Sequence, residues 1–251
     1  MSDAPRVAVF RPNDERIEDA MAALASLGAD PVADPMLAIE PTGETPADAS
    51  YVVVTSKTGV ELAADAGWDP GDATLVAIGP ATAAAAHDAG WTVDIVPEEY
   101  TSAGLVAALR DRVDGVSVEV ARSDHGSEVL LDGLAEAGAD VTETVLYRLT
   151  RPAAAGDSAV AAAGGELDAV AFTSSLTVAH FLEAAAERGV RDAALAGLDE
   201  AIVGAIGAPT AETAAEHGID VDVVPDEAAF DALATAVVDA AGMSADATDA
   251  E

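Results

Sequence analysis

The sequence predicts an α/β fold of two similar doubly wound parallel-sheet domains joined by a two-stranded antiparallel β hinge. Short β-branched runs alternate with helical patterns, which is the order of elements in such a layered fold. Gly79 and Pro97 map onto Gly207 and Pro225 by the same shift of 128 residues, which indicates a duplication. The repeated segments are 6–30 with 116–140 and 51–109 with 169–237.

The expected strands are short runs rich in valine and isoleucine, which is typical of buried parallel strands. We expect helices between them. In the first of these, Ile17, Met21, Leu24 and Leu27 recur at helical spacing, and Gly28 follows as a stop. The expected strands are residues 7–10, 51–55, 75–78, 93–96, 118–121, 168–173, 201–206 and 220–224.

Two extended segments bounded by proline interrupt this alternation, residues 30–41 and 142–152. If they pair antiparallel, they form the hinge and the chain crosses between the domains twice. Similar halves usually face each other across a cleft, where small ligands bind. The expected domains are residues 1–33 with 153–240, then 37–149, with a flexible acidic tail at 241–251.

The composition is acidic and poor in lysine. The chain has 46 acidic residues against 11 basic ones, a formal charge of −35, yet 51% of it is hydrophobic, so it should fold. Lys57 is the only lysine. This pattern is typical of a halophile, whose salt screens the repulsion, and an ordinary acidic protein is the alternative. Nucleic acids and anionic membranes are poor partners for a protein with such a negative charge.

Several classes of site are missing from the sequence. The chain contains no cysteine, and its four histidines have no metal-ligand spacing, so we expect neither a metal nor a cofactor. No G-x-G-x-x-G follows a strand and no G-x-S-x-G elbow occurs. The acidic start is unlike a signal peptide, and no apolar run has the length of a membrane helix. We expect a cytoplasmic monomer.

Hydroxyl groups and glycines stand where four of the expected strands end and helices begin. Helix starts offer free backbone N–H groups, and the carboxyl edge of a parallel sheet is where such proteins bind ligands. Four such starts at one edge favour an anion site, and plain helix capping is the alternative. The candidate residues are Thr55, Ser56, Lys57, Gly79, Thr82, Thr173, Ser174, Ser175, Gly207 and Thr210.

Basic residues gather near the same motifs. Arg11 and Arg122 follow equivalent strands, and we expect them, with Ser123, to bind carboxylates from opposite sides of the cleft. Arg148 and Arg151 lie close by in the sequence. Solvent-facing ion pairs are the alternative for any one of these arginines.

In order and spacing, these motifs resemble the uroporphyrinogen-III synthase family. The pattern is a strand ending in Thr-Ser, then I-G-x-x-T, then V-x-V-V-P, and it covers about residues 6–240. Between its two copies stand RSDHG at 122–126 and VLYR at 145–148. The resemblance implies two α/β domains joined by a two-stranded β ladder. The copies are 54–60, 78–82 and 93–97, then 172–178, 206–210 and 221–225.

The resemblance also implies a reaction. The family's enzymes are cofactor-free lyases of tetrapyrrole biosynthesis that cyclise the linear tetrapyrrole hydroxymethylbilane to uroporphyrinogen III. Water is lost, ring D is inverted through a spiro intermediate, and the macrocycle closes. Helix starts carry partial positive charge, which suits the many carboxylates of this substrate. The upstream hydroxymethylbilane synthase is a candidate partner. The alternative function is a non-catalytic two-domain binding protein for a small polycarboxylate anion.

The family places a tyrosine near the departing hydroxyl, and the VLYR motif puts it at Tyr147 on the expected hinge. Met36 stands at the corresponding place in the other half, so the phenol is not duplicated. A phenol is a weak acid at neutral pH, so we expect an assisting hydrogen bond rather than a dominant catalytic role. Packing of the hinge is the alternative role for Tyr147.

Overall fold

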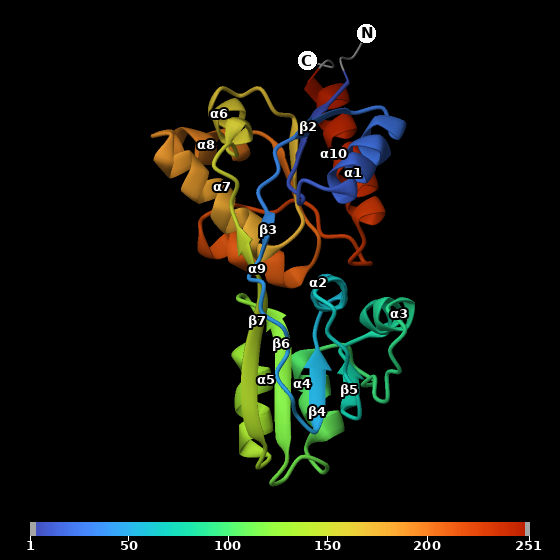
Figure 1. The fold of residues 1–251 in the computed structure, drawn as a ribbon. Coiled ribbons are helices and arrows are strands. Elements are labelled where there is room, and N and C mark those ends of the chain that lie inside the picture. Colours follow the sequence, from blue (N-terminus) through green and yellow to red (C-terminus); the bar gives the residue numbers. More distant parts are fainter. Residues whose placement is uncertain (1–3, 249–251) are drawn as a thin grey trace. The chain divides into compact units, whose positions relative to one another are not determined.

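The computed structural model describes residues 4–248, with side chains up to residue 242, and divides into two compact units (Figure 1). Unit 1 comprises the residues up to Ala38 and those from Thr150 onward, and unit 2 comprises Ile39–Leu149. Unit 2 is therefore one continuous segment inserted into unit 1. That each unit is an independent domain stays a prediction.

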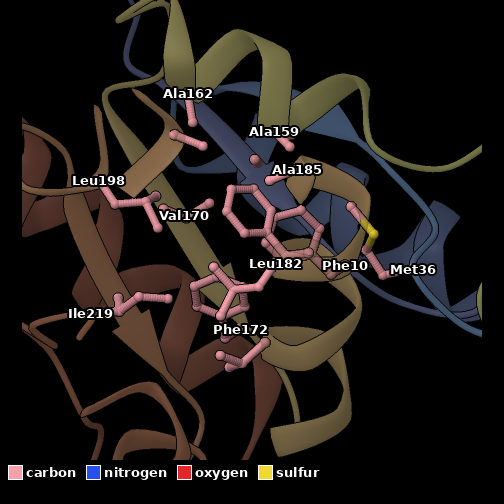
Figure 2. Packing of buried hydrophobic residues seen from close by; sticks show 14 of the residues in the cluster. Phe10, Met36, Ala159, Ala162, Val170, Phe172, Leu182, Ala185, Leu198 and Ile219 are labelled. Carbon is pink, nitrogen blue, oxygen red and sulfur yellow. The ribbon is translucent and has the colours of Figure 1, made fainter. Parts of the chain in front are cut away.

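Unit 1 is built on a four-stranded parallel sheet in the order β2-β1-β8-β9. Helices cover both faces, because residues alternate between two hydrophobic clusters along each strand. Figure 2 shows Phe10, Phe172 and Leu182 packing in one of them. The strands are β1 (Arg6–Val9), β2 (Asp30–Ala33), β8 (Ala169–Phe172) and β9 (Ile202–Ala205). On one face lie α1 (Glu15–Ser26) and α10 (Phe230–Thr248), and on the other α6 (Asp157–Ala163), α7 (Ser175–Glu187), α8 (Arg191–Leu198) and α9 (Ala208–Glu216).

Unit 2 contains a five-stranded sheet in the order β3-β7-β6-β4-β5, also covered on both faces. The pairs among β4, β5, β6 and β7 are parallel. Its strands are β3 (Ala38–Pro41), β4 (Tyr51–Val54), β5 (Thr74–Ala77), β6 (Ser117–Ser123) and β7 (Asp140–Thr150). One face carries α2 (Lys57–Asp65) and α3 (Pro80–Asp88), and the other carries α4 (Ser102–Leu109) and α5 (Glu128–Glu136).

The two sheets share one topology. The order β2-β1-β8-β9 of unit 1 corresponds to β7-β6-β4-β5 of unit 2, strand for strand along the repeats read from the sequence. Helices α6 and α8 have no counterpart among the described helices of unit 2, and β3 adds an edge strand that unit 1 lacks among the described residues. The mixed α/β fold with parallel sheets predicted from the sequence is confirmed.

Two of the eight predicted strands are wrong. Residues 93–96 and 220–224 form only single bridges, Ile95 with Val76 and Val223 with Gly204. At each place an aspartate carboxylate takes part in the ladder, since Leu75 N donates to Asp94 and Val203 N to Asp222, both at 2.8 Å. A proline follows two residues after each bridge and supplies no backbone donor. These two β-branched runs therefore form single bridges and not strands.

Two other expectations are corrected. Segment 30–41 forms two strands in different sheets, since β2 pairs parallel with β1 while β3 lies beside β7. The segment from 241, expected to be an irregular tail, continues α10 as far as Thr248, because alanine-rich sequence favours helix. Residues 249–251 lie outside the described residues. The hinge role of β3 and β7 stays a prediction.

We expect the melting temperature to rise steeply as KCl is raised from 50 mM to molar concentration. Basic side chains are too few to neutralise a formal charge of −35, so the compact state depends on screening by salt. Circular dichroism melts across a KCl series measure the effect. A native spectrum and an unchanged melting temperature in 50 mM KCl would remove the halophilic interpretation.

Within residues 4–248, no helix is both long and apolar enough to cross a membrane.

Candidate functional site

The phenol of Tyr147 lies at the carboxyl edge of the unit 2 sheet. Its hydroxyl donates to Ser56 Oγ at 3.0 Å, and Ser56 Oγ also accepts from Gly59 N at 2.9 Å as the N-cap of α2. The Tyr147 ring is 7% exposed and packs in the core under α2 and α3. A side chain at Gly59 would press on Ser56 Oγ, because a Cβ added there would lie 3.0 Å from that oxygen. The sequence therefore places a buried phenol against a helix start.

The loop after β6 is attached to the same part of β7. Ser123 is the register partner of Tyr147, at a bulge in the β6–β7 pairing. Asp124 N donates to Tyr147 O at 3.2 Å, and Leu149 N donates to Asp124 Oδ1 at 3.0 Å. The structure thus brings Thr55, Ser56, Ser123 and Tyr147 to one edge, since Thr55 N donates to Ala121 O on the neighbouring strand.

Asp124 holds His125 beside this edge, with His125 Nδ1 donating to Asp124 Oδ1 at 2.9 Å. Burial raises the pKa of Asp124, but the hydrogen bonds from His125 and from Leu149 N outweigh it, so the pKa lies below its ordinary value. Asp124 is therefore ionised at neutral pH. The sequence reasoning did not single out this pair.

Arg122 does not stand free at the edge. Its side chain is 4% exposed, and its Nε and Nη2 pair with Glu143 at 2.5 Å and Glu128 at 3.1 Å. Its Nη1 donates to Ser127 O at 2.7 Å. All three guanidinium nitrogens thus serve the protein, so the expected carboxylate clamp is replaced by a positioning role. Arg122 fixes the loop that carries Ser123 and Asp124.

The two threonines of the I-G-x-x-T motifs are not helix caps. Gly79 and Gly207 are the N-caps of α3 and α9, and neither helix has a side-chain cap hydrogen bond. Thr82 and Thr210 stand three positions later and are each 4% exposed. The first turns therefore keep backbone N–H groups without a side-chain cap, although Pro80 and Pro209 have no N–H and Thr210 N donates to Gly207 O at 3.1 Å.

The corresponding edge of unit 1 uses its hydroxyls differently. Thr173 donates to Phe10 O at 2.7 Å, which ties β8 to the end of β1. Ser174 caps α7 in a capping box with Thr177, and Ser175 Oγ donates to Pro209 O at 3.1 Å, so it connects α7 to α9. These three hydroxyls already bond within the protein. The repeat of 6–30 with 116–140 places Leu37, and not the expected Met36, at the position of Tyr147. Both side chains are buried, Met36 in the core that Figure 2 shows, and neither offers a proton.

Arg11 follows β1 and has its guanidinium over the ring of Phe230, 5.0 Å from the ring centroid. Its Nε is buried and has no hydrogen-bond partner among the described residues. Burial, followed by repulsion from Arg16, lowers the pKa of Arg11, although an arginine stays protonated at neutral pH. Arg11 is thus a cation without an ion pair in the described part of the chain, in a protein otherwise rich in carboxylates.

The other three basic candidates are Lys57, Arg148 and Arg151, and two of them form ion pairs within the protein. Lys57 opens α2, is 66% exposed at its side chain and pairs with Glu61 at 3.4 Å. Arg151 pairs with Glu187 at 2.5 Å. Arg148 is exposed and lines a pocket with Glu40 and Thr42. Among the described residues, no group of three or more acidic or histidine side chains could hold a metal ion.

Comparisons with known proteins agree on one family. The family model described as uroporphyrinogen-III synthase HemD matches residues 18–235. A candidate uroporphyrinogen-III synthase of Methanothermobacter thermautotrophicus is 38% identical over 152 residues, which is 59% of this chain and 59% of that protein. The match thus spans less than two thirds of the relative's length.

Two solved structures share the fold. A mutant uroporphyrinogen III synthase from the extremely thermophilic bacterium Thermus thermophilus superposes with a TM-score of 0.66 at 22% identity, covering 98% of this chain and 100% of that one. The uroporphyrinogen-III synthetase of Helicobacter pylori gives a TM-score of 0.58 at 16% identity, covering 91% and 96%. At these identities the structures support the fold alone.

Proposed function

Since this chain belongs to the uroporphyrinogen-III synthase family, we propose that it cyclises hydroxymethylbilane to uroporphyrinogen III, with loss of water and inversion of ring D. The observation that carries the proposal is the hydrogen bond between Tyr147 and Ser56 at the carboxyl edge of unit 2. It puts a phenol, a hydroxyl and a helix start within one small region of the sheet edge.

The two hydroxyls form a short donor chain. A serine hydroxyl has one proton to donate and two lone pairs to accept. Ser56 Oγ accepts from Tyr147 and from Gly59 N, so its own proton is the one available to a substrate oxygen. Polarised by these two donors, Ser56 can hydrogen-bond the departing hydroxyl while Tyr147 supports it from the core. The hydroxyl departs as water by taking the Ser56 proton, which the Tyr147 proton replaces, and a cationic pyrrole system remains. Its folding within the site decides between the two isomers, and the proton released when the macrocycle closes restores the phenol.

Substrate carboxylates are assigned to helix starts and to two basic side chains. The first turns of α3 and α9 lack side-chain caps, so their backbone N–H groups can bind acetate and propionate arms. These N–H groups, rather than the buried hydroxyls of Thr82 and Thr210, carry the proposal. Lys57 and Arg11 add full charges, Lys57 at the start of α2 and Arg11 after β1.

Incubation with enzymatically generated hydroxymethylbilane tests the activity. Left alone, this substrate closes to uroporphyrinogen I, so formation of the type III isomer reports catalysis. A non-catalytic binding protein for polycarboxylates, the alternative function, would leave the type I product unchanged. Monomeric state, the hinge and the upstream synthase as a partner stay predictions.

We expect Arg11→Met to raise the KM for hydroxymethylbilane about 5- to 30-fold with little change in melting temperature. The substitution removes one charge-assisted carboxylate contact, while the methionine still packs on Phe230. Arg6→Met is the matched control, because Arg6 begins the same strand at its amino end and pairs with Asp30 and Glu166. Equal KM values for Arg11→Met and the wild type would assign Arg11 to packing alone.

A further inference from the structure

One exposed aromatic side chain stands at the proposed site without a role in it. Tyr100 is 59% exposed, and it is the only aromatic residue among the exposed large hydrophobic side chains of the described chain. It lies between the Ile95 bridge and α4, in a segment that neither motif nor periodicity distinguished. Exposure of a single aromatic side chain is common on protein surfaces, so a role for Tyr100 depends on where it lies.

The ring rests on the start of α3. A Cβ added to Gly79 would lie 3.3 Å from both Cβ and Cγ of Tyr100, so glycine is what lets the tyrosine come this close. Gly79 follows β5, and Ser56 follows the neighbouring strand β4, with Ile78 N donating to Val54 O at 3.1 Å between them. Tyr100 and the Tyr147–Ser56 pair therefore belong to the same carboxyl edge of unit 2.

The backbone beneath Tyr100 is fixed. Thr101 caps α4 by accepting from Gly104 N at 3.0 Å. Glu99 O approaches Gly104 so closely that a Cβ added there would overlap it. No larger residue fits at position 104 without moving the segment. The tyrosine is thus presented by a short, closely packed turn and not by a loose loop.

The duplicated half shows that this aromatic residue is not part of the scaffold. The repeat that maps Pro97 onto Pro225 places Ala228 at the position of Tyr100. Beside Gly207, the equivalent of Gly79, the nearest atom to an added Cβ is Pro209 Cδ at 4.0 Å. Among the described residues, Gly207 thus has no close aromatic contact of the kind that Tyr100 makes with Gly79. The carboxyl edges of the two sheets therefore differ chemically, as binding of an asymmetric ligand requires.

We propose that the exposed face of Tyr100 stacks on a pyrrole ring of the linear tetrapyrrole, which makes Tyr100 a substrate-positioning residue. The inference rests on the proposed function for its ligand. A flat, electron-rich pyrrole matches a phenol ring in shape and apolar surface. The N–H groups at the start of α3 lie at the base of the same ring, within reach of the acidic arms that each pyrrole carries.

Tyr100→Ala tests the proposal against Tyr100→Phe, which keeps the ring and removes the hydroxyl. We expect Tyr100→Ala to raise the KM for hydroxymethylbilane about 5- to 20-fold with kcat within about twofold, and Tyr100→Phe to behave as the wild type. Val160→Ala, which trims an exposed apolar residue on α6, is the control for general surface effects. Melting temperatures of all variants report whether the fold is preserved.

A titration that needs no turnover separates this proposal from the proposed activity. Uroporphyrin I, the stable oxidised macrocycle with the same acidic arms, is added to each variant and its visible absorption band is followed. We expect Tyr100→Ala to weaken binding by about the same 5- to 20-fold factor. Wild-type affinity and KM in Tyr100→Ala would overturn the proposal, and so would a loss in Tyr100→Phe as large as in Tyr100→Ala. If the wild type makes no uroporphyrinogen III, the activity fails while the titration still decides on Tyr100.

Discussion

Tyr147→Phe is expected to lower turnover about 10- to 1,000-fold, which is the range of help from one positioned proton donor or slightly below it. The ring stays in its core position under α2 and α3, and only the hydroxyl that donates to Ser56 is lost. Removing one partly buried hydrogen bond costs roughly 1 kcal/mol, so the fold should survive. Some product still forms, because the site continues to fold the substrate. The measurement is turnover together with the ratio of type III to type I uroporphyrinogen.

Two further variants make this result specific. Tyr51→Phe makes the same chemical change at the amino end of β4, and it should behave as the wild type. Ser56→Ala removes both the acceptor of the phenol and the cap of α2, so it should lower turnover at least as much as Tyr147→Phe and also lower the melting temperature. A Tyr147→Phe protein with wild-type rate and isomer ratio would show that the tyrosine only packs the core.

Arg122→Ala is expected to lower the free energy of unfolding by about 2–4 kcal/mol and to reduce activity further than stability alone explains. The side chain is 4% exposed and holds Glu143, Glu128 and a backbone carbonyl together. Its removal leaves a cavity and frees the loop that joins Asp124 to Tyr147. Chemical denaturation measures the first effect, and kcat/KM at a temperature where the variant is fully folded measures the second.

Variants of Glu128 and Glu143 measure how much each ion pair of Arg122 contributes to stability. Glu128 is 74% exposed at its side chain, so Glu128→Gln should change stability by less than about 1 kcal/mol. Glu143 is 32% exposed, and Glu143→Gln should cost more. Arg122→Lys keeps the charge but loses the planar fork, so it should recover only part of the stability. If Arg122→Ala unfolds at the same denaturant concentration as the wild type, the arginine is not the support of this loop.

The sequence predicted the sheets well because the signal was local and repeated. Six of the eight predicted strands form, and their spatial order is the same in both units. The two failures share a cause that periodicity does not report, since Asp94 and Asp222 contribute their side chains to the backbone ladder. The repeat also did not predict helices α6 and α8, because nothing in it indicates an insertion in one copy.

Prediction of the site was limited because contacts between side chains far apart in the sequence could not be predicted. Thr-Ser motifs marked the helix starts, and Ser56 does meet Tyr147 across 91 residues of sequence. Arg122 looked like a free cation, yet its partners Glu143 and Glu128 become visible only when β7 and α5 are placed. Tyr100 carried no motif, and the one signal that could have found it was its replacement by alanine in the repeat.

The insertion of unit 2 into unit 1 fixes the order in which the strands of the two units are synthesised. All of unit 2 has been synthesised once Leu149 is added, before β8 and β9 of unit 1 exist. Strand β1, in contrast, pairs with β8, so Val7 must wait for Ala169. At a synthesis rate of about 5–20 residues per second, the first strands of unit 1 remain unpaired on one side for many seconds. We expect the high acidic charge to reduce association of such exposed nascent segments, because like-charged chains repel each other.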